Sequence, residues 1–218
     1  MQKNKSRSVF QIMVDFVTFP VRAVTLFHKD RWGLSALASE RFDYVAREVN
    51  GDCLDVGCGR NNRFINEYLH GNGKGIDIFP YDGLTTDNIV VDLTHLEYED
   101  ATFGTVTFIA NVNHIPKSQR HAELREAYRV LEQNGKVVIT MGNPLAEIAV
   151  HRLVRLYDQH FKTHYDMDSE RGMDEEEAYY LSDNEITELL TQAGFHSIIK
   201  KYFLTQWGLN HLFVASKK

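Results

Sequence analysis

Short apolar runs alternate with longer amphipathic stretches from about residue 46 to the end of the chain. The apolar runs have the length and β-branched content of strands, whereas the stretches between them repeat their apolar residues at helical spacing. The runs predict seven strands, at 53–56, 73–78, 88–91, 105–110, 136–141, 196–204 and 211–216. The stretches predict helices at 62–69, 118–131 and 182–193. This order is typical of an α/β fold with a doubly wound, mostly parallel sheet, and the last two strands are close enough to pair only as an antiparallel hairpin.

Residues 143–181 interrupt this alternation. An amphipathic helix is predicted over 145–161, and the acidic stretch over 166–177 is predicted to be a solvated face. Regular structure resumes at Ser182 and Glu185, which have the spacing of a capping box. We therefore expect 143–181 to be a helical insertion that serves as a lid over an acceptor.

The first 45 residues are expected to form a helical cap in front of a ligand-binding domain at 46–218. On a helix the polar residues between positions 9 and 27 form one narrow stripe, with apolar residues around the rest of the circumference. The stripe consists of Gln11, Asp15, Thr18, Arg22 and Thr25. Pro20 is expected to kink or split this helix, because proline removes a backbone donor and clashes with the preceding turn.

Three interpretations of residues 9–27 remain open: a cap that partly roofs the ligand site, a homodimer interface, and a membrane-surface helix. The segment is flanked by basic residues, which favour contact with anionic headgroups. A membrane-spanning helix is not expected, because Asp15, Pro20 and Arg22 lie in the middle of the segment. A secretory signal peptide is not expected either, since Asp15 interrupts the apolar run.

The overall charge restricts the classes of partner. The chain has 218 residues and a net charge of −6, which argues against a broad nucleic-acid surface. Its two cysteines, Cys53 and Cys58, have no metal-ligand or disulfide spacing and fit a reduced, cytoplasmic setting.

A nucleotide-binding βαβ unit is indicated around residues 52–78. The strand ending at Val56 leads into a turn with Gly57 and Gly59, whose missing Cβ atoms let a ligand approach the backbone. Asp77 lies 22 positions after Asp55, close to the offset of about 20 residues at which an acid meets the ribose hydroxyls.

Several segments in order make the chain resemble a class I S-adenosylmethionine-dependent methyltransferase, over roughly 40–142 and 182–218. The segments are Leu54-Asp55-Val56-Gly57-Cys58-Gly59, Asp77, Asp92-Leu93, Glu126-Ala127-Tyr128-Arg129-Val130-Leu131, Asn134-Gly135-Lys136-Val137-Val138-Ile139 and Ala193-Gly194-Phe195. The resemblance implies a Rossmann-like fold, S-adenosylmethionine as cofactor and methyl transfer as the reaction.

The resemblance also implies which residues bind the cofactor. Four residues of the glycine turn would line its methionine and ribose portion: Asp55, Gly57, Cys58 and Gly59. Asp77, followed by Ile78, would accept hydrogen bonds from the ribose hydroxyls. Asp92 and Leu93 would hold the adenine edge, and Asn111 would lie near the amino-acid end.

The chain departs from the family pattern at Asn61, where a third glycine is common. Asparagine is the non-glycine residue best able to adopt a left-handed backbone, so the turn can be retained. A turn that departs from the family geometry would instead favour a non-catalytic relative that binds the cofactor. A nicotinamide oxidoreductase is disfavoured, because Asn62 occupies the third glycine position of that fingerprint.

His114 is the candidate general base, in the loop Asn111-Val112-Asn113-His114-Ile115-Pro116 that follows a predicted strand. A base is needed only if the attacking atom must lose a proton, as a hydroxyl oxygen does. The alternative is that His114 only bonds the backbone of its loop. His151, His160 and His164 are expected to be solvated, and Asp166 and Asp168 have no partners that would make a metal site. The expected acceptor is a small or lipid-like molecule.

Overall fold

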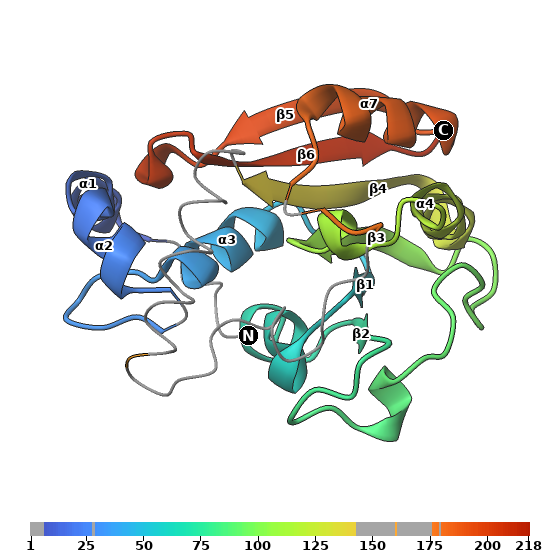
Figure 1. Ribbon diagram of the computed structural model, residues 1–218, viewed down its shortest axis with the longest axis horizontal. Helices are drawn as coiled ribbons and strands as arrows, with labels where there is room; N and C mark the ends of the chain where they lie inside the picture. The colour runs from blue at the N-terminus through green and yellow to red at the C-terminus, as the bar shows by residue number, and fades with distance from the viewer. Residues whose placement is uncertain (1–6, 28, 143–159, 161–175, 179) are drawn as a thin grey trace.

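The computed structural model describes residues 7–27, 29–142, 160, 176–178 and 180–218, and the statements below refer to these residues. Six strands form one sheet in the order β2-β1-β3-β4-β6-β5 (Figure 1). The strands are β1 (Cys53–Val56), β2 (Lys74–Ile76), β3 (Phe103–Ile109), β4 (Leu131–Gly142), β5 (His196–Tyr202) and β6 (Asn210–Ser216). The first four are parallel to one another, while β6 runs antiparallel to both β4 and β5. The predicted α/β fold and its terminal hairpin are confirmed.

The predicted seventh strand, at 88–91, is wrong for this structure. Only an isolated parallel bridge joins Asp77 to Ile89. Asn88 is instead engaged by a local turn: its side-chain oxygen accepts from the Thr85 backbone, and its amide donates to the Gly75 carbonyl at 2.7 Å. Because Asn88 closes this turn and Val91 is fully exposed, pairing along the sheet edge stops after one bridge.

The helices are α1 (Val9–Val17), α2 (Phe19–Thr25), α3 (Leu37–Ala46), α4 (Arg120–Val130) and α7 (Asp183–Gln192). Shorter helical turns lie at Arg60–Asn62, Phe64–Tyr68, Thr86–Asn88, Val112–His114 and Leu204–Gln206. The predicted capping box is present at α7, where the Glu185 backbone donates to Ser182 Oγ and the Glu185 carboxylate accepts from the Ser182 backbone. The predicted helix at 145–161 and most of the insertion at 143–181 lie outside the described residues.

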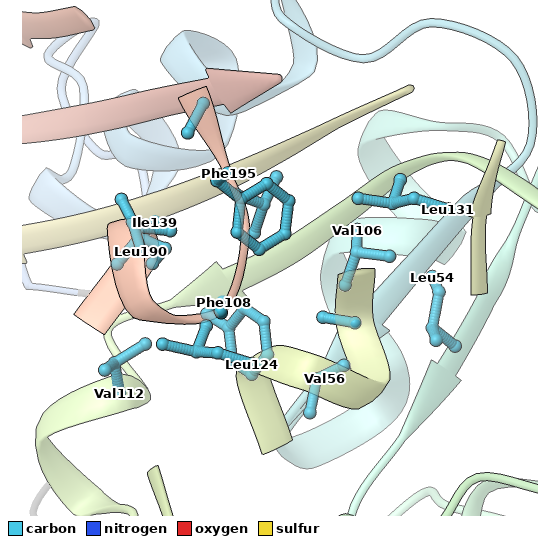
Figure 2. Packing of buried hydrophobic residues seen from close by; sticks show 14 of the residues in the cluster. Leu54, Val56, Val106, Phe108, Val112, Leu124, Leu131, Ile139, Leu190 and Phe195 are labelled. Atoms are coloured by element: carbon cyan, nitrogen blue, oxygen red, sulfur yellow. The ribbon is translucent and has the colours of Figure 1, made fainter. Parts of the chain in front are cut away.

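Alternate residues of the strands pack on opposite faces of the sheet. On one face, Leu124 of α4 and Leu190 of α7 pack with strand residues such as Val106 and Phe108 (Figure 2). On the other face, Val45 of α3 packs with Phe64 and with strand residues including Cys53 and Val138. The sheet is therefore covered by helices on both sides, and its core excludes water along β1, β3 and β4.

Pro20 lies in the first turn of α2, and the predicted N-terminal helix is split at Thr18 between α1 and α2. Both helices lie beside the turn that joins β5 to β6 (Figure 1). The carboxyl end of β4 pairs with the start of β6, at Gly142 and Asn210, so this turn lies at the carboxyl edge of the parallel strands. Among the described helices, none combines the length and apolar character that crossing a membrane requires.

Candidate functional site

The glycine turn lies at the carboxyl end of β1. Gly57 has φ +73°, and Gly59 has φ 63° and ψ −168°, a region that essentially only glycine adopts. The backbone N–H groups of Gly57 and Cys58 both donate to the Ile76 carbonyl, at 2.8 and 3.1 Å. A Cβ on Gly57 would lie 2.3 Å from Asn111 Nδ2, so a larger residue would displace the Asn111 side chain.

Asp77 is buried and connects this turn to the segment after β2. Its Oδ2 accepts from the Gly59 backbone N–H at 3.0 Å, and its Oδ1 accepts from the Phe79 backbone N–H at 2.9 Å. A carboxylate oxygen can accept more than one hydrogen bond. The spacing from Asp55 that singled out Asp77 in the sequence thus corresponds to direct contact between Asp77 and the glycine turn.

Asn61 has φ 61° and ψ 9°, which confirms the left-handed backbone expected of the residue that replaces the third glycine. Asn62 is also left-handed, with φ 46°. Asn61 is held there by its backbone N–H, which donates to the Asp82 carbonyl at 2.9 Å. The helix predicted at 62–69 is shorter in the structure: after the left-handed Asn61 and Asn62 the backbone is right-handed at Arg63, and a π-helix spans Phe64–Tyr68.

Asp55 lies beneath the turn, buried within β1. The Thr107 hydroxyl of β3 donates to Asp55 Oδ1 at 2.6 Å. Burial raises the pKa of Asp55 to about 7, the Thr107 hydrogen bond lowers it in part, and the nearby Asp77 charge raises it. Thr107 was not identified from the sequence as a hydrogen-bond partner of Asp55. Its side chain is fully buried, like that of Thr105 two residues earlier in β3.

We expect Asp55→Asn to remove a pH-dependent loss of stability. An acid with a raised folded-state pKa binds a proton more tightly when folded, so its stabilisation is present below pH ~4 and lost as pH rises to ~7. The loss for wild type is about 4 kcal/mol if the whole shift is expressed. Denaturant unfolding at pH 4.5 and at pH 8 measures the free energy of unfolding. We expect this free energy to fall less between the two pH values for Asp55→Asn than for wild type. Burial also raises the pKa of Glu123 to about 8, so this residue lowers the free energy of unfolding by the same amount in both proteins as pH rises. Equal declines in the two proteins would contradict the role given to Asp55.

The remaining expected cofactor residues differ in burial. Asn111 donates from Nδ2 to the Val56 carbonyl at 3.0 Å, which places it against the glycine turn. Asp92 is exposed and accepts from the Thr94 backbone and hydroxyl, both at 2.7 Å, which lower its pKa. Leu93 is buried in the core and Ile78 is half exposed. Cys53 and Cys58 are buried free thiols, and burial raises the pKa of both.

His114 lies in the helical turn after β3 and faces residues 176–178. Its Nδ1 is 3.7 Å from the Glu177 carboxylate, and its Nε2 is 3.0 Å from Asn113 Nδ2. The two segments are joined by the Ala178 backbone N–H, which donates to the Asn113 carbonyl at 2.9 Å. The prediction that the acidic stretch is solvated is therefore wrong at its end, because the Glu177 side chain is 3% exposed.

The other sequence candidates give no second site within the described residues. His160 is exposed, as expected, while His151, His164, Asp166 and Asp168 lie outside the described residues. In the described part of the chain no group of histidine, cysteine and acidic side chains could hold a metal ion.

A sequence model for a methyltransferase domain matches residues 29–198 of this chain. No curated protein matches the sequence. Solved structures with a similar fold include a possible histamine N-methyltransferase from Thermotoga maritima, at 16% identity and a TM-score of 0.56 over 96% of this chain and 100% of that chain. A second is an S-adenosylmethionine-dependent methyltransferase from Methanosarcina mazei, at 20% identity and a TM-score of 0.52 over 80% and 96%. A third is a methyltransferase in complex with the Trm112 activator of Haloferax volcanii, at 14% identity and a TM-score of 0.56 over 81% and 88%.

Proposed function

This chain belongs to the family of class I S-adenosylmethionine-dependent methyltransferase domains, and on that premise we propose that it methylates a small or lipid-like acceptor at a hydroxyl oxygen. When bound, the cofactor supplies an electrophilic methyl group on a sulfonium centre. The protein must then align the acceptor oxygen with that methyl group and exclude water, and such alignment can lower a barrier by about 7–11 kcal/mol.

The backbone conformation of the glycine turn supports cofactor binding there. Gly59 adopts a conformation closed to residues with a Cβ, and its N–H is fixed by Asp77. We assign the ribose hydroxyls to Asp77, because its buried carboxylate lies against the glycine turn and carboxylate oxygens accept from hydroxyl donors. Asp92 and Leu93 are assigned to the adenine edge, and Gly57, Cys58 and Asn111 to the methionine portion. Asp55 is assigned a supporting role beneath the glycine turn, where it accepts a hydrogen bond from the Thr107 hydroxyl.

The observation that supports an oxygen acceptor is the pairing of His114 with Glu177. A hydroxyl nucleophile must lose its proton as the carbon–oxygen bond forms, and an imidazole accepts protons near neutral pH. The Glu177 carboxylate, 3.7 Å from Nδ1, would stabilise the imidazolium that results. Proton acceptance at Nε2 requires the acceptor hydroxyl to replace the Asn113 amide, which lies 3.0 Å from that nitrogen.

We expect His114→Ala to reduce kcat for a hydroxyl acceptor by roughly 10²–10⁴-fold, the usual contribution of a general base. Release of S-adenosylhomocysteine would be measured with hydroxyl, amine and thiol acceptors as a function of pH. Wild-type kcat should fall at pH values where His114 is protonated, and this limb of the profile should be absent from the variant. His95→Ala, at an exposed histidine, is the matched control.

Cofactor affinity separates a catalytic His114 from a structural one. Unchanged affinity for S-adenosylhomocysteine in His114→Ala, together with reduced kcat, supports the general base. An equal loss of cofactor binding, or turnover that is undiminished for every acceptor, would show that His114 serves only to hold its loop.

A small acceptor is also consistent with the net charge of −6, which disfavours a nucleic-acid substrate. The Thermotoga maritima neighbour is described as a possible histamine N-methyltransferase, but at 16% identity that likeness extends to the fold alone.

A further inference from the structure

The helices α1 and α2 place the charged residues of their polar stripe inward and most of their apolar residues outward, although Thr25 of the stripe is exposed and Phe19 is buried. Asp15 and Arg22, both in the stripe, have fully buried side chains. Seven apolar residues of the two helices are 42–75% exposed: Val9, Phe10, Met13, Phe16, Val17, Val21 and Val24. A helix on the surface of a soluble domain normally has the opposite orientation, with its apolar stripe on the core.

A buried ionic network fixes this orientation. The Arg22 guanidinium pairs with Glu40 of α3 at 2.9 Å and donates to the carbonyls of Ser35 and Thr205 at 2.7 and 2.8 Å. Asp15 accepts from the Ser35 hydroxyl at 2.7 Å and pairs with Arg7 at 2.8 Å. Turning the apolar face toward the domain would move Asp15 and Arg22 into water and take the Arg22 partner from the buried Glu40 carboxylate. Removing one partner of a buried ion pair costs about 3–5 kcal/mol.

The outward face continues onto the turn between β5 and β6. Trp207 donates from Nε1 to the Phe16 carbonyl at 2.8 Å, and its ring lies 5.3 Å from that of Phe19. Trp207 remains 52% exposed and Leu204 63% exposed. In Figure 1, α1, α2 and this turn project together at one end of the molecule. Contiguous apolar patches larger than a few hundred Å² are rare on monomers and mark interaction sites.

The N-terminal segment of the sequence differs in charge from the rest of the chain. Within residues 1–31 there are six basic and two acidic residues, whereas the whole chain has a net charge of −6. Lys3 and Lys5 precede α1 in the sequence, and the exposed Lys29 and Arg31 follow α2. Arg7 and Arg22 are paired with buried acids, so the exposed basic residues in the described part of this segment are Lys29 and Arg31, which are close in sequence to the exposed indole of Trp32.

We propose that the outward face of α1 and α2 docks onto an anionic lipid bilayer. Apolar side chains enter the interface between headgroups and acyl chains, basic flanks contact anionic headgroups, and tryptophan prefers this depth. A second copy of the chain is a poorer occupant, because a two-fold interface pairs the patch with itself and brings like basic segments together. This docking would hold the enzyme at the surface where a lipid-like acceptor resides.

The test is co-sedimentation of the full chain with vesicles of phosphatidylcholine mixed with phosphatidylglycerol, compared with vesicles of phosphatidylcholine alone. Wild type is expected to bind the anionic vesicles at low salt and to lose most of that binding at high salt, since the basic contribution is screened. Phe10→Asp/Met13→Asp, at two exposed positions of α1, should weaken binding at least ~10-fold. Val91→Asp adds a charge at a fully exposed site near β2, on the opposite edge of the sheet, and should bind as wild type does.

Three outcomes would overturn the proposal. One is an absence of binding by folded wild type, and another is equal binding by the double variant, whose folding is checked by circular dichroism. The third is a concentration-dependent dimer in sedimentation velocity that the double variant abolishes while vesicles capture neither protein, which would assign the face to a second copy. Each outcome leaves methyl transfer in solution unaffected, so failure here is separate from failure of the proposed function.

Discussion

Asp77→Ala is expected to weaken binding of S-adenosylmethionine by at least ~100-fold, because hydrogen bonds to a charged acceptor contribute about 1.5–3 kcal/mol each and the proposed ribose contact has two. The substitution also removes the acceptor that fixes the Gly59 and Phe79 N–H groups, so the turn loses its link to the segment after β2. Equilibrium dialysis with radiolabelled cofactor measures the change.

Two further variants separate the loss of charge from the loss of the turn. Asp77→Asn keeps one carbonyl oxygen and should bind more tightly than Asp77→Ala but more weakly than wild type. Asp82→Ala removes an exposed acid from the same region and should bind like wild type. If Asp77→Ala folds and keeps wild-type affinity, the ribose does not contact this carboxylate.

Arg22→Met is expected to lower the free energy of unfolding by about 3–5 kcal/mol, since it removes one of the two cations, Arg7 and Arg22, that pair with the buried acids Asp15 and Glu40. The side chain of Arg22 is fully buried, and its partners come from four parts of the chain: α1, the segment before α3, α3 itself and the turn before β6. Denaturant unfolding followed by circular dichroism measures the effect.

Exposed and compensating substitutions give the controls for Arg22. Arg31→Met, at an exposed position, should change stability by less than about 0.5 kcal/mol. Combining Arg22→Met with Glu40→Gln should recover part of the loss, because the stranded charge is neutralised. A cost below about 1 kcal/mol for Arg22→Met alone would mean that the network does not fix α1 and α2 on the domain.

The parts of the fold that local rules determine could be predicted from the sequence. Alternating strands and helices, the capping box at Ser182 and the break at Pro20 all follow from short-range patterns. The left-handed Asn61 was predictable for the same reason, because its backbone preference is intrinsic. The strand expected at 88–91 failed because a competing local bond, from Asn88 to Thr85, closes a turn in its place.

Contacts between distant residues could not be predicted. The inward orientation of the Asp15 and Arg22 stripe depends on Glu40 of α3 and on the carbonyl of Thr205, and no helical pattern reveals either partner. Glu177 likewise reads as one more acid in a polar stretch until the fold brings it to His114. Asp77 was found because its offset from the glycine turn is a property of the βαβ unit itself.

The most direct test of the central claim, that this fold binds S-adenosylmethionine at the glycine turn, is a calorimetric titration of wild-type protein with S-adenosylhomocysteine. We expect one binding site per chain with a dissociation constant in the micromolar range. Absence of heat and of any thermal stabilisation, with protein that unfolds cooperatively, would contradict it.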